Sequence, residues 1–261
     1  MSRLRILLVL LIVGAILALV LSFRQEPTSS DLTEAEAIDL SGYDDEGALV
    51  WHICAKSGEL KEDRGHLSDV MVRFFADDEE PLEARSATLI VRKGEATLEG
   101  GVEATRGEGY RLTTEQITWN EAERTLTAHR VEITTDGGTI EANEFRYDLA
   151  SERSVLSGGI DARIDRSTPI TVSGDQASEE NGLLQITGGV TIFNDEEIYH
   201  CSRLEYDTES DTVCLIDSVK GTFQKGEIYA DAITLTQDGI EAVGDVVLDL
   251  HDLFFGGPDD A

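Results

Sequence analysis

A valine or isoleucine recurs along most of this chain at intervals of about 29 residues, and this period constrains the fold more than any other feature. Each recurring residue has small or polar neighbours, as in LEGGVEA, LSGGIDA and ITGGVTI. Self-similarity of this length is typical of repeat architectures, whose units bury their apolar faces against one another. The chain therefore contains seven repeat copies, the first looser than the others, with recurring residues Val70, Val102, Val131, Ile160, Val190, Val219 and Val246.

Each unit is predicted to form two short β-strands. Apolar and polar side chains alternate before the recurring residue, as in EFRYD, where Phe145 and Tyr147 share one face of a strand. The polar segments NEAERT, DLASERS, DTESDT and QDG separate the strands and suit reversals between antiparallel neighbours. No helical period follows residue 40, although LTEAEAIDL at 32–40 leaves room for one helical turn. The pattern predicts an all-β jelly roll, sandwich or solenoid.

Paired glycines precede the recurring residue in three units, at 100–101, 158–159 and 188–189. Glycine inside a strand marks a bulge or a bend where a side chain would obstruct the backbone. Because the pairs keep the same place in each unit, we expect them to be corners rather than weak points in the strands.

The first 24 residues differ from the repeats in composition. Residues 4–23 contain one charged residue, Arg5, and a helix of about 20 residues covers the roughly 30 Å hydrocarbon core of a bilayer. Arg3 and Arg5 lie at its start, so the positive-inside tendency places the N-terminus in the cytoplasm and the remainder in the periplasm. A cleaved signal peptide is the alternative, but no A-x-A-like site follows. We expect one uncleaved transmembrane helix over 1–24, anchored in the inner membrane.

The rest of the chain divides into three parts. Residues 25–37 are predicted to be a polar tether. The following residues, up to about 255, suffice for one large β domain or two fused ones, with Pro169 as the most plausible seam. Residues 256–261 are expected to form a flexible tail.

The charge balance is strongly acidic. The chain has 52 acidic and 21 basic residues, for a net charge of −31. The phosphate backbone requires a cationic surface, so nucleic acid is excluded as a natural partner. The acidic runs at 44–46, 77–80 and 195–197 offer oxygen ligands for Ca²⁺. None has the spacing of an EF-hand loop, and solvated acids are the preferred interpretation.

Three cysteines leave at least one unpaired. Cys201 and Cys214 flank the turn DTES, so they either form a disulfide across a hairpin or remain two buried thiols. Cys54 is expected to be a small buried apolar residue.

No catalytic motif is present in the sequence. It has no GxSxG elbow, Walker loop or dinucleotide fingerprint, and no pair of acids stands out as a glycan-cleaving site. The histidines show no metal-ligand spacing, so we expect no enzyme activity, metal or cofactor. They are scattered over different repeats, at His52, His66, His129, His200 and His251.

The alternating residues of the repeats can line one continuous apolar face. In a closed structure this face is the core, whereas in an open one it is a trough that accepts apolar cargo such as acyl chains; the sequence leaves both open. Its members are Val102, Ile117, Trp119, Val131, Ile133, Phe145, Tyr147, Ile160, Val190, Ile192, Leu204, Tyr206, Ile233 and Leu235.

The order of segments resembles a known family. The N-terminal span, the tether, WHICAK, LSDVMVRFF and the tract from EARSATLIV to IEANEFRYD are similar to LptC, the membrane-anchored component of the lipopolysaccharide export machinery. The tract from LSGGIDARI to LIDSVKGTF resembles the related LptA and OstA-like repeats. The resemblance implies an LptC-like β-jelly roll at 38–165 and an LptA/OstA-like extension at 166–255.

The resemblance also implies a function. Family members form elongated, open jelly rolls of stacked antiparallel strands with an apolar groove. They pass lipopolysaccharide, or a similar envelope glycolipid, from an inner-membrane ABC transporter toward the outer membrane, and they join other jelly-roll proteins through edge strands. This chain departs from a minimal LptC in its length and in its acidity. A membrane-tethered structural or adhesin-like repeat protein with a filled core is the alternative.

Overall fold

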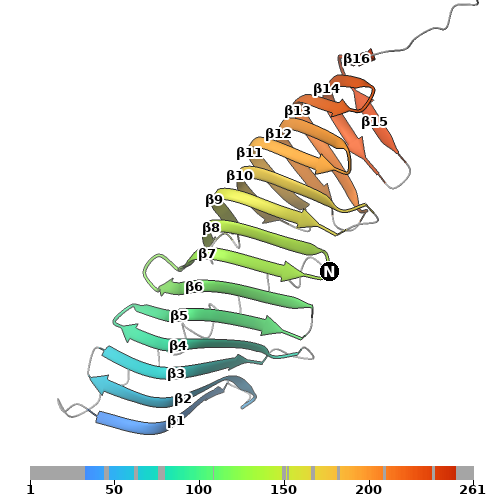
Figure 1. The fold of residues 1–261 in the computed structure, drawn as a ribbon. Helices are drawn as coiled ribbons and strands as arrows, with labels where there is room; N and C mark the ends of the chain where they lie inside the picture. Colours follow the sequence, from blue (N-terminus) through green and yellow to red (C-terminus); the bar gives the residue numbers. More distant parts are fainter. Residues whose placement is uncertain are drawn as a thin grey trace, which may run out of the picture.

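The computed structural model describes residues 33–250, with short gaps at 44–46, 62–63, 76–79, 108, 149–150, 152, 166–167, 181–182, 208–209 and 237–238. This part of the chain is all-β, and its 16 strands form one antiparallel sheet. Each strand from β1 to β14 pairs with the next one in the sequence, and β16 also pairs with β14. The strands therefore stack one on the next along an elongated body (Figure 1). Their bounds are β1 Thr33–Tyr43, β2 Leu49–Lys61, β3 Arg64–Phe74, β4 Leu82–Arg92, β5 Glu95–Arg106, β6 Tyr110–Asn120, β7 Thr125–Thr135, β8 Gly138–Asp148, β9 Arg153–Ile164, β10 Ile170–Glu180, β11 Leu183–Asn194, β12 Glu197–Asp207, β13 Thr212–Phe223, β14 Gly226–Leu235, β15 Ile240–Val243 and β16 Val247–Leu250.

The period of about 29 residues corresponds to two strands and their turns, as predicted. The polar segments lie between consecutive strands: NEAERT between β6 and β7, DLASERS between β8 and β9, DTESDT between β12 and β13, and QDG between β14 and β15. Each recurring valine or isoleucine falls in the middle of an odd-numbered strand, except Val246, which lies between β15 and β16.

A corner in the backbone precedes every recurring residue. The predicted glycine pairs have positive φ, and units without them place other residues in the same left-handed region. At Gly100 and Gly101, β5 has one residue more than β6 between two matched pairs, Leu98 with Ile117 and Val102 with Thr114. Such a bulge bends the strand and increases its twist. The left-handed residues are Ala37, Asp69, Gly100, Gly101, Arg130, Gly158, Gly159, Gly188, Gly189, Asp217, Ser218 and Gly244.

The start of the sheet differs from the prediction. The helical turn allowed for 32–40 is wrong, because Thr33–Tyr43 is strand β1 and pairs with β2. Ala37 has a φ of 55°, and Ile38 follows it as the recurring residue of an eighth copy. Residues 33–37, predicted as the end of the tether, therefore belong to the sheet.

The sheet continues through the predicted seam at Pro169. Strands β9 and β10 flank it and pair directly, with Ile164 opposite Ile170. The segments 38–165 and 166–255 thus contribute to one sheet as far as the structure describes them.

The predicted membrane span at 1–24 and tail at 256–261 lie outside the described residues. Within the described ranges, no helix is long and apolar enough to cross a membrane.

Candidate functional site

The apolar face predicted from the repeats forms one cluster inside the folded sheet. Because the side chains of a strand alternate between its faces, each half of a strand from β2 to β14 contributes one to three of them to the interior. Of the fourteen predicted members, Ile133 and Tyr206 are partly buried against the cluster. The other twelve are buried, namely Val102, Ile117, Trp119, Val131, Phe145, Tyr147, Ile160, Val190, Ile192, Leu204, Ile233 and Leu235.

The same face extends further toward the N-terminal end than the sequence indicated. Trp51 and Ile53 of β2, Leu67 of β3 and Leu89 of β4 belong to the cluster. The alternation in WHICAK was a usable signal for Trp51 and Ile53, since they are separated by one residue. The apolar interior therefore runs continuously from β2 to β14.

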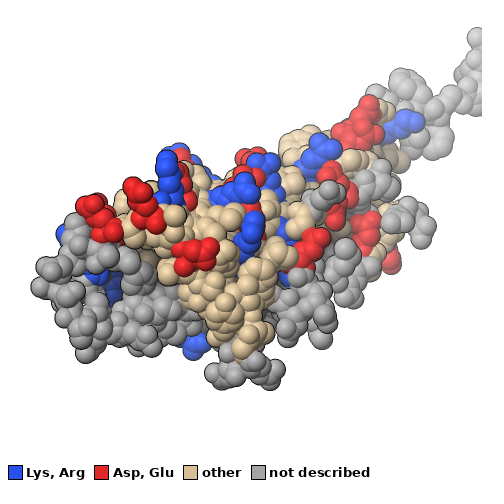
Figure 2. Space-filling view, turned by 90° about the horizontal axis from the view of Figure 1, so that it is seen from below, with Lys and Arg blue, Asp and Glu red and all other residues tan. Residues whose placement is uncertain are grey.

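Carboxylates stay outside this interior. Among the side chains that the structure describes, no Asp or Glu is buried, and Arg106 is the one buried charged group. Arg106 Nε donates a hydrogen bond to the Glu80 carbonyl oxygen at 3.0 Å, and burial lowers the pKa of this guanidinium. On the outer surface in Figure 2, acidic side chains alternate with basic ones along the body. The acidic side chains that the structure describes thus lie away from the apolar face.

One polar atom in the interior lacks a partner. The indole of Trp119 is fully buried, and its Nε1–H makes no hydrogen bond within the described part of the structure. Leu126 separates it from Tyr147 in one row across β6, β7 and β8. An unsatisfied buried donor costs about 1 to 3 kcal/mol, so this N–H offers a bond to an acceptor entering the interior.

None of the described strands covers the last layer of the sheet, formed by β15 and β16. Residues Ile240–Val243 and Val247–Leu250 form two short strands on β14, separated by a corner at Gly244. Ile240 pairs with Leu235 of the interior, yet Ile240 is 52% exposed. Leu248 lies opposite Ile228 and is 54% exposed. The final layer thus combines an open strand edge with apolar side chains that continue the interior.

The structure has the second of the two alternatives left open for the cysteine pair, thiols without a disulfide. Cys201 and Cys214 are free thiols, because Cys214 is paired with Glu205 rather than with Cys201. Cys201 is buried, and burial raises the pKa of its thiol to about 11. The expectation for Cys54 is wrong, since its side chain is half-buried on the outer face of β2, near Asp39 and His52.

Comparison with known proteins places the chain in a family. The model of the family described as lipopolysaccharide-assembly, LptC-related, matches residues 6–165. Among solved structures, the chain is similar to LptH of Pseudomonas aeruginosa, described as the LptA-homologous periplasmic component of the lipopolysaccharide transport device. That likeness has 12% identity and a TM-score of 0.27, and covers 51% of this chain and 80% of LptH. No curated protein sequence matches the chain significantly. Since the family match covers more than half of the chain, the protein belongs to the LptC-related family of lipopolysaccharide-assembly proteins.

Proposed function

We propose that this protein is an inner-membrane-anchored periplasmic carrier that binds the acyl chains of lipopolysaccharide, or of a similar envelope glycolipid, along its apolar interior. The observation that carries this proposal is the continuity of that interior from β2 to β14. Membership of the LptC-related family supports it. The carrier would receive lipid from an ABC transporter and pass it toward the outer membrane without chemical change.

Lipid entry requires a movement of the sheet. The twelve buried members of the apolar face contact the rest of the cluster, so acyl chains would enter by separating the two halves of the bent strands. Such an exchange replaces protein contacts with lipid contacts of the same apolar character. Each Å² of acyl surface taken from water contributes roughly 25 cal/mol.

The distribution of charge favours binding of the acyl chains in the interior over binding of the charged head group there. Anionic glycolipid would be repelled by carboxylates beside its chains, but the described interior holds none. The phosphates and sugars of a bound lipid would remain at the outer surface, where Lys and Arg are interspersed among the acids (Figure 2).

Transfer to the next protein would use the uncovered layer of β15 and β16. A partner strand can pair with this edge while its apolar residues cover Ile240 and Leu248. Two jelly rolls joined in this way would share one apolar interior, which is the geometry that passage of lipid between them requires.

A second candidate is a membrane-tethered structural repeat protein. The observation that favours it is the burial of the twelve residues, because a filled core needs no cargo. The two candidates differ in whether lipid reaches the interior in the cell.

The test is site-specific photocrosslinking with the full chain in cells that make lipopolysaccharide. A photoreactive amino acid would replace Phe145 or Leu204, which are buried, and the matched controls would replace Arg146 or Glu205, their outward neighbours. We expect lipopolysaccharide adducts from the buried positions only. Absence of lipid adducts at both buried positions, in protein that is folded and in the membrane, would support the structural repeat protein.

A further inference from the structure

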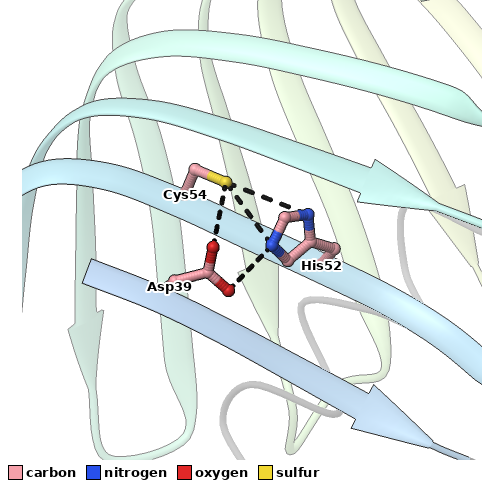
Figure 3. Close-up of side chains that lie close together, drawn as sticks. All are labelled: Asp39, His52 and Cys54. Carbon is pink, nitrogen blue, oxygen red and sulfur yellow. Dashed lines mark hydrogen bonds and ion pairs between the residues drawn. The ribbon is translucent and has the colours of Figure 1, made fainter. Parts of the chain in front are cut away.

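Three side chains of different chemistry converge on the outer face of the first two strands (Figure 3). They are Asp39 of β1 and His52 and Cys54 of β2. His52 Nε2 lies 2.9 Å from Asp39 Oδ1 and 3.5 Å from Cys54 Sγ. Cys54 Sγ lies 4.0 Å from Asp39 Oδ2. One donor atom from each residue thus lies within 4.8 Å of the other two.

The strand register explains why these residues meet. Asp39 and Cys54 are directly paired across β1 and β2. His52 is two residues from Cys54, so both side chains point to the same face of β2, away from the buried Trp51 and Ile53. The cluster is therefore fixed by backbone pairing and does not depend on a loop.

The arrangement differs from a nucleophile–histidine–acid relay. In a relay, the thiol and the carboxylate contact different ring nitrogens of the histidine. Here the same atom, His52 Nε2, is the nearest nitrogen to Cys54 Sγ and also contacts Asp39 Oδ1. Convergence of three donors on one point is the geometry of ligands around a cation.

The separations also fit a tetrahedral zinc centre. Zinc bonds of about 2.3 Å to sulfur and 2.0 to 2.2 Å to nitrogen or oxygen place tetrahedral ligand atoms about 3.3 to 3.6 Å apart. Cys54 Sγ and His52 Nε2 are 3.5 Å apart, within this range. The two Asp39 oxygens lie on either side of it, with Oδ1 2.9 Å from His52 Nε2 and Oδ2 4.0 Å from Cys54 Sγ. Small rotations of the Asp39 side chain, which is 68% exposed, are enough to equalise them.

We propose that Asp39, His52 and Cys54 form a binding site for a thiophilic divalent cation of the Zn²⁺ class. Thiolate, imidazole and carboxylate are ligands that zinc accepts, and water would complete the tetrahedron on the exposed side. Binding displaces the proton of the Cys54 thiol, which passes to solvent while sulfur bonds the metal. Hard cations such as Ca²⁺ and Mg²⁺ prefer sites made of oxygen ligands alone.

Such a site would tie the first strand to the sheet. In the described sheet, β1 pairs on one side only, with β2. A metal bonded to Asp39 on β1 and to two residues on β2 crosslinks the edge strand at its centre, beyond what its ladder of hydrogen bonds provides. The strand that follows the predicted membrane anchor would then resist peeling from the body. This proposal does not depend on the lipid-carrier function.

The test uses the reduced, metal-free full chain in detergent, titrated with Co²⁺ as a spectroscopic probe and then with Zn²⁺. We expect one Co²⁺ per chain with a thiolate-to-cobalt charge-transfer band that Zn²⁺ abolishes. Zn²⁺ at ~100 times its Kd should raise Tm by about 5 to 10 °C. Cys54→Ser should eliminate the band, and His52→Gln should weaken binding more than about 100-fold.

The matched control is Cys214→Ser, which changes another half-buried thiol far along the sheet. It should keep the wild-type band and the wild-type rise in Tm. Circular dichroism would establish that each variant is folded. The absence of a thiolate band in the folded wild-type chain, or its persistence in Cys54→Ser, would overturn the proposal.

Discussion

Val219 and Val246 occupy equivalent positions in successive repeats, yet Val219 is 1% exposed and Val246 is 45% exposed. Val219 is paired with Ala230 on one side of β14. On the other side Val247 is paired with Tyr229, which places Val246 beside the same Ala230. The difference in burial arises because Val219 is covered by neighbouring strands, whereas none of the described strands covers Val246.

Replacing Val246 with Asp should therefore affect docking rather than folding. We expect Val246→Asp to change the free energy of unfolding by no more than about 0.5 kcal/mol, as is usual at exposed positions. Binding to an LptA-type protein of the same organism should fall at least ~tenfold, because a charge would be desolvated at the joint. Thermal unfolding and a pull-down with purified partner check the two effects.

Val219→Asp is the matched comparison. It buries an unpaired carboxylate in the core, so it should destabilise the fold by several kcal/mol, of order 2 to 5. Equal destabilisation by the two substitutions would contradict the view that the last layer is an open surface.

The corner before Val190 offers a paired test of backbone strain. A Cβ at Gly188 would clash with Asp175 Oδ2 and lie 2.6 Å from Asp175 Cβ, whereas a Cβ at Gly189 would meet nothing within 4 Å. Both glycines have positive φ, which costs an ordinary residue about 1 to 2 kcal/mol. In urea unfolding, Gly189→Ala should lower the free energy of unfolding by that cost alone, and Gly188→Ala should lower it by more. Equal costs would show that contact with Asp175 is unimportant.

The raised pKa of Cys201 predicts slow alkylation. With a pKa of about 11, only ~0.1% of this thiol is ionised at pH 8, and thiolate is the reactive form. Iodoacetamide should label Cys54 and Cys214, which are half-buried, well before Cys201. Peptide mapping by mass spectrometry, with urea-unfolded protein as the control, checks the order. Early labelling of Cys201, or a Cys201–Cys214 disulfide in nonreduced protein, would contradict the observed register.

Glu83 predicts a pH-dependent contribution to stability. The hydrogen bond from Arg73 Nε, at 2.8 Å, is the largest cause lowering the pKa of Glu83, and Arg85 adds to it. A carboxyl whose pKa is lower in the folded state stabilises the fold above its unfolded pKa, and this contribution is lost as pH falls through the folded pKa. Glu83→Gln should therefore destabilise the protein at pH 7 by up to about 1 kcal/mol, and less in acid. Urea unfolding of the wild type and of Glu83→Gln, at pH 7 and in acid, tests this. The same loss of stability under both conditions would contradict it.

Much of the fold follows from the repeat. The period and the alternation in EFRYD predicted the strand pairs, and the paired glycines predicted the corners, because both depend on local backbone geometry. Strand β1 was missed since its acidic and alanine-rich residues favour helix, and Ala37 replaces the glycine that marks other corners. Pairing with β2 overrides that local preference.

The site was predictable only in part. Alternation identified the apolar face, including Phe145 and Leu204. Whether the two halves of a bent sheet close on each other depends on contacts between strands far apart in the sequence, which a local pattern does not show. The cluster of Asp39, His52 and Cys54 was missed because its members come from two strands, and one of those strands was not recognised. The sequence left a Cys201–Cys214 disulfide and two free thiols open because the choice depends on strand register, and in the structure Cys214, the third residue of β13, lies opposite Glu205.

The central claim is that lipid occupies the apolar interior. The most direct measurement is native mass spectrometry of the full chain, purified from its own membranes in mild detergent, with Leu204→Asp as the variant and Glu205→Gln as the outward control. Leu204 is fully buried, so the new carboxylate would stand among the bound acyl chains. The account predicts a glycolipid-sized adduct on the wild type and on Glu205→Gln, and its loss from folded Leu204→Asp. A wild-type chain that stays free of lipid after incubation with lipopolysaccharide and other envelope lipids would contradict the account.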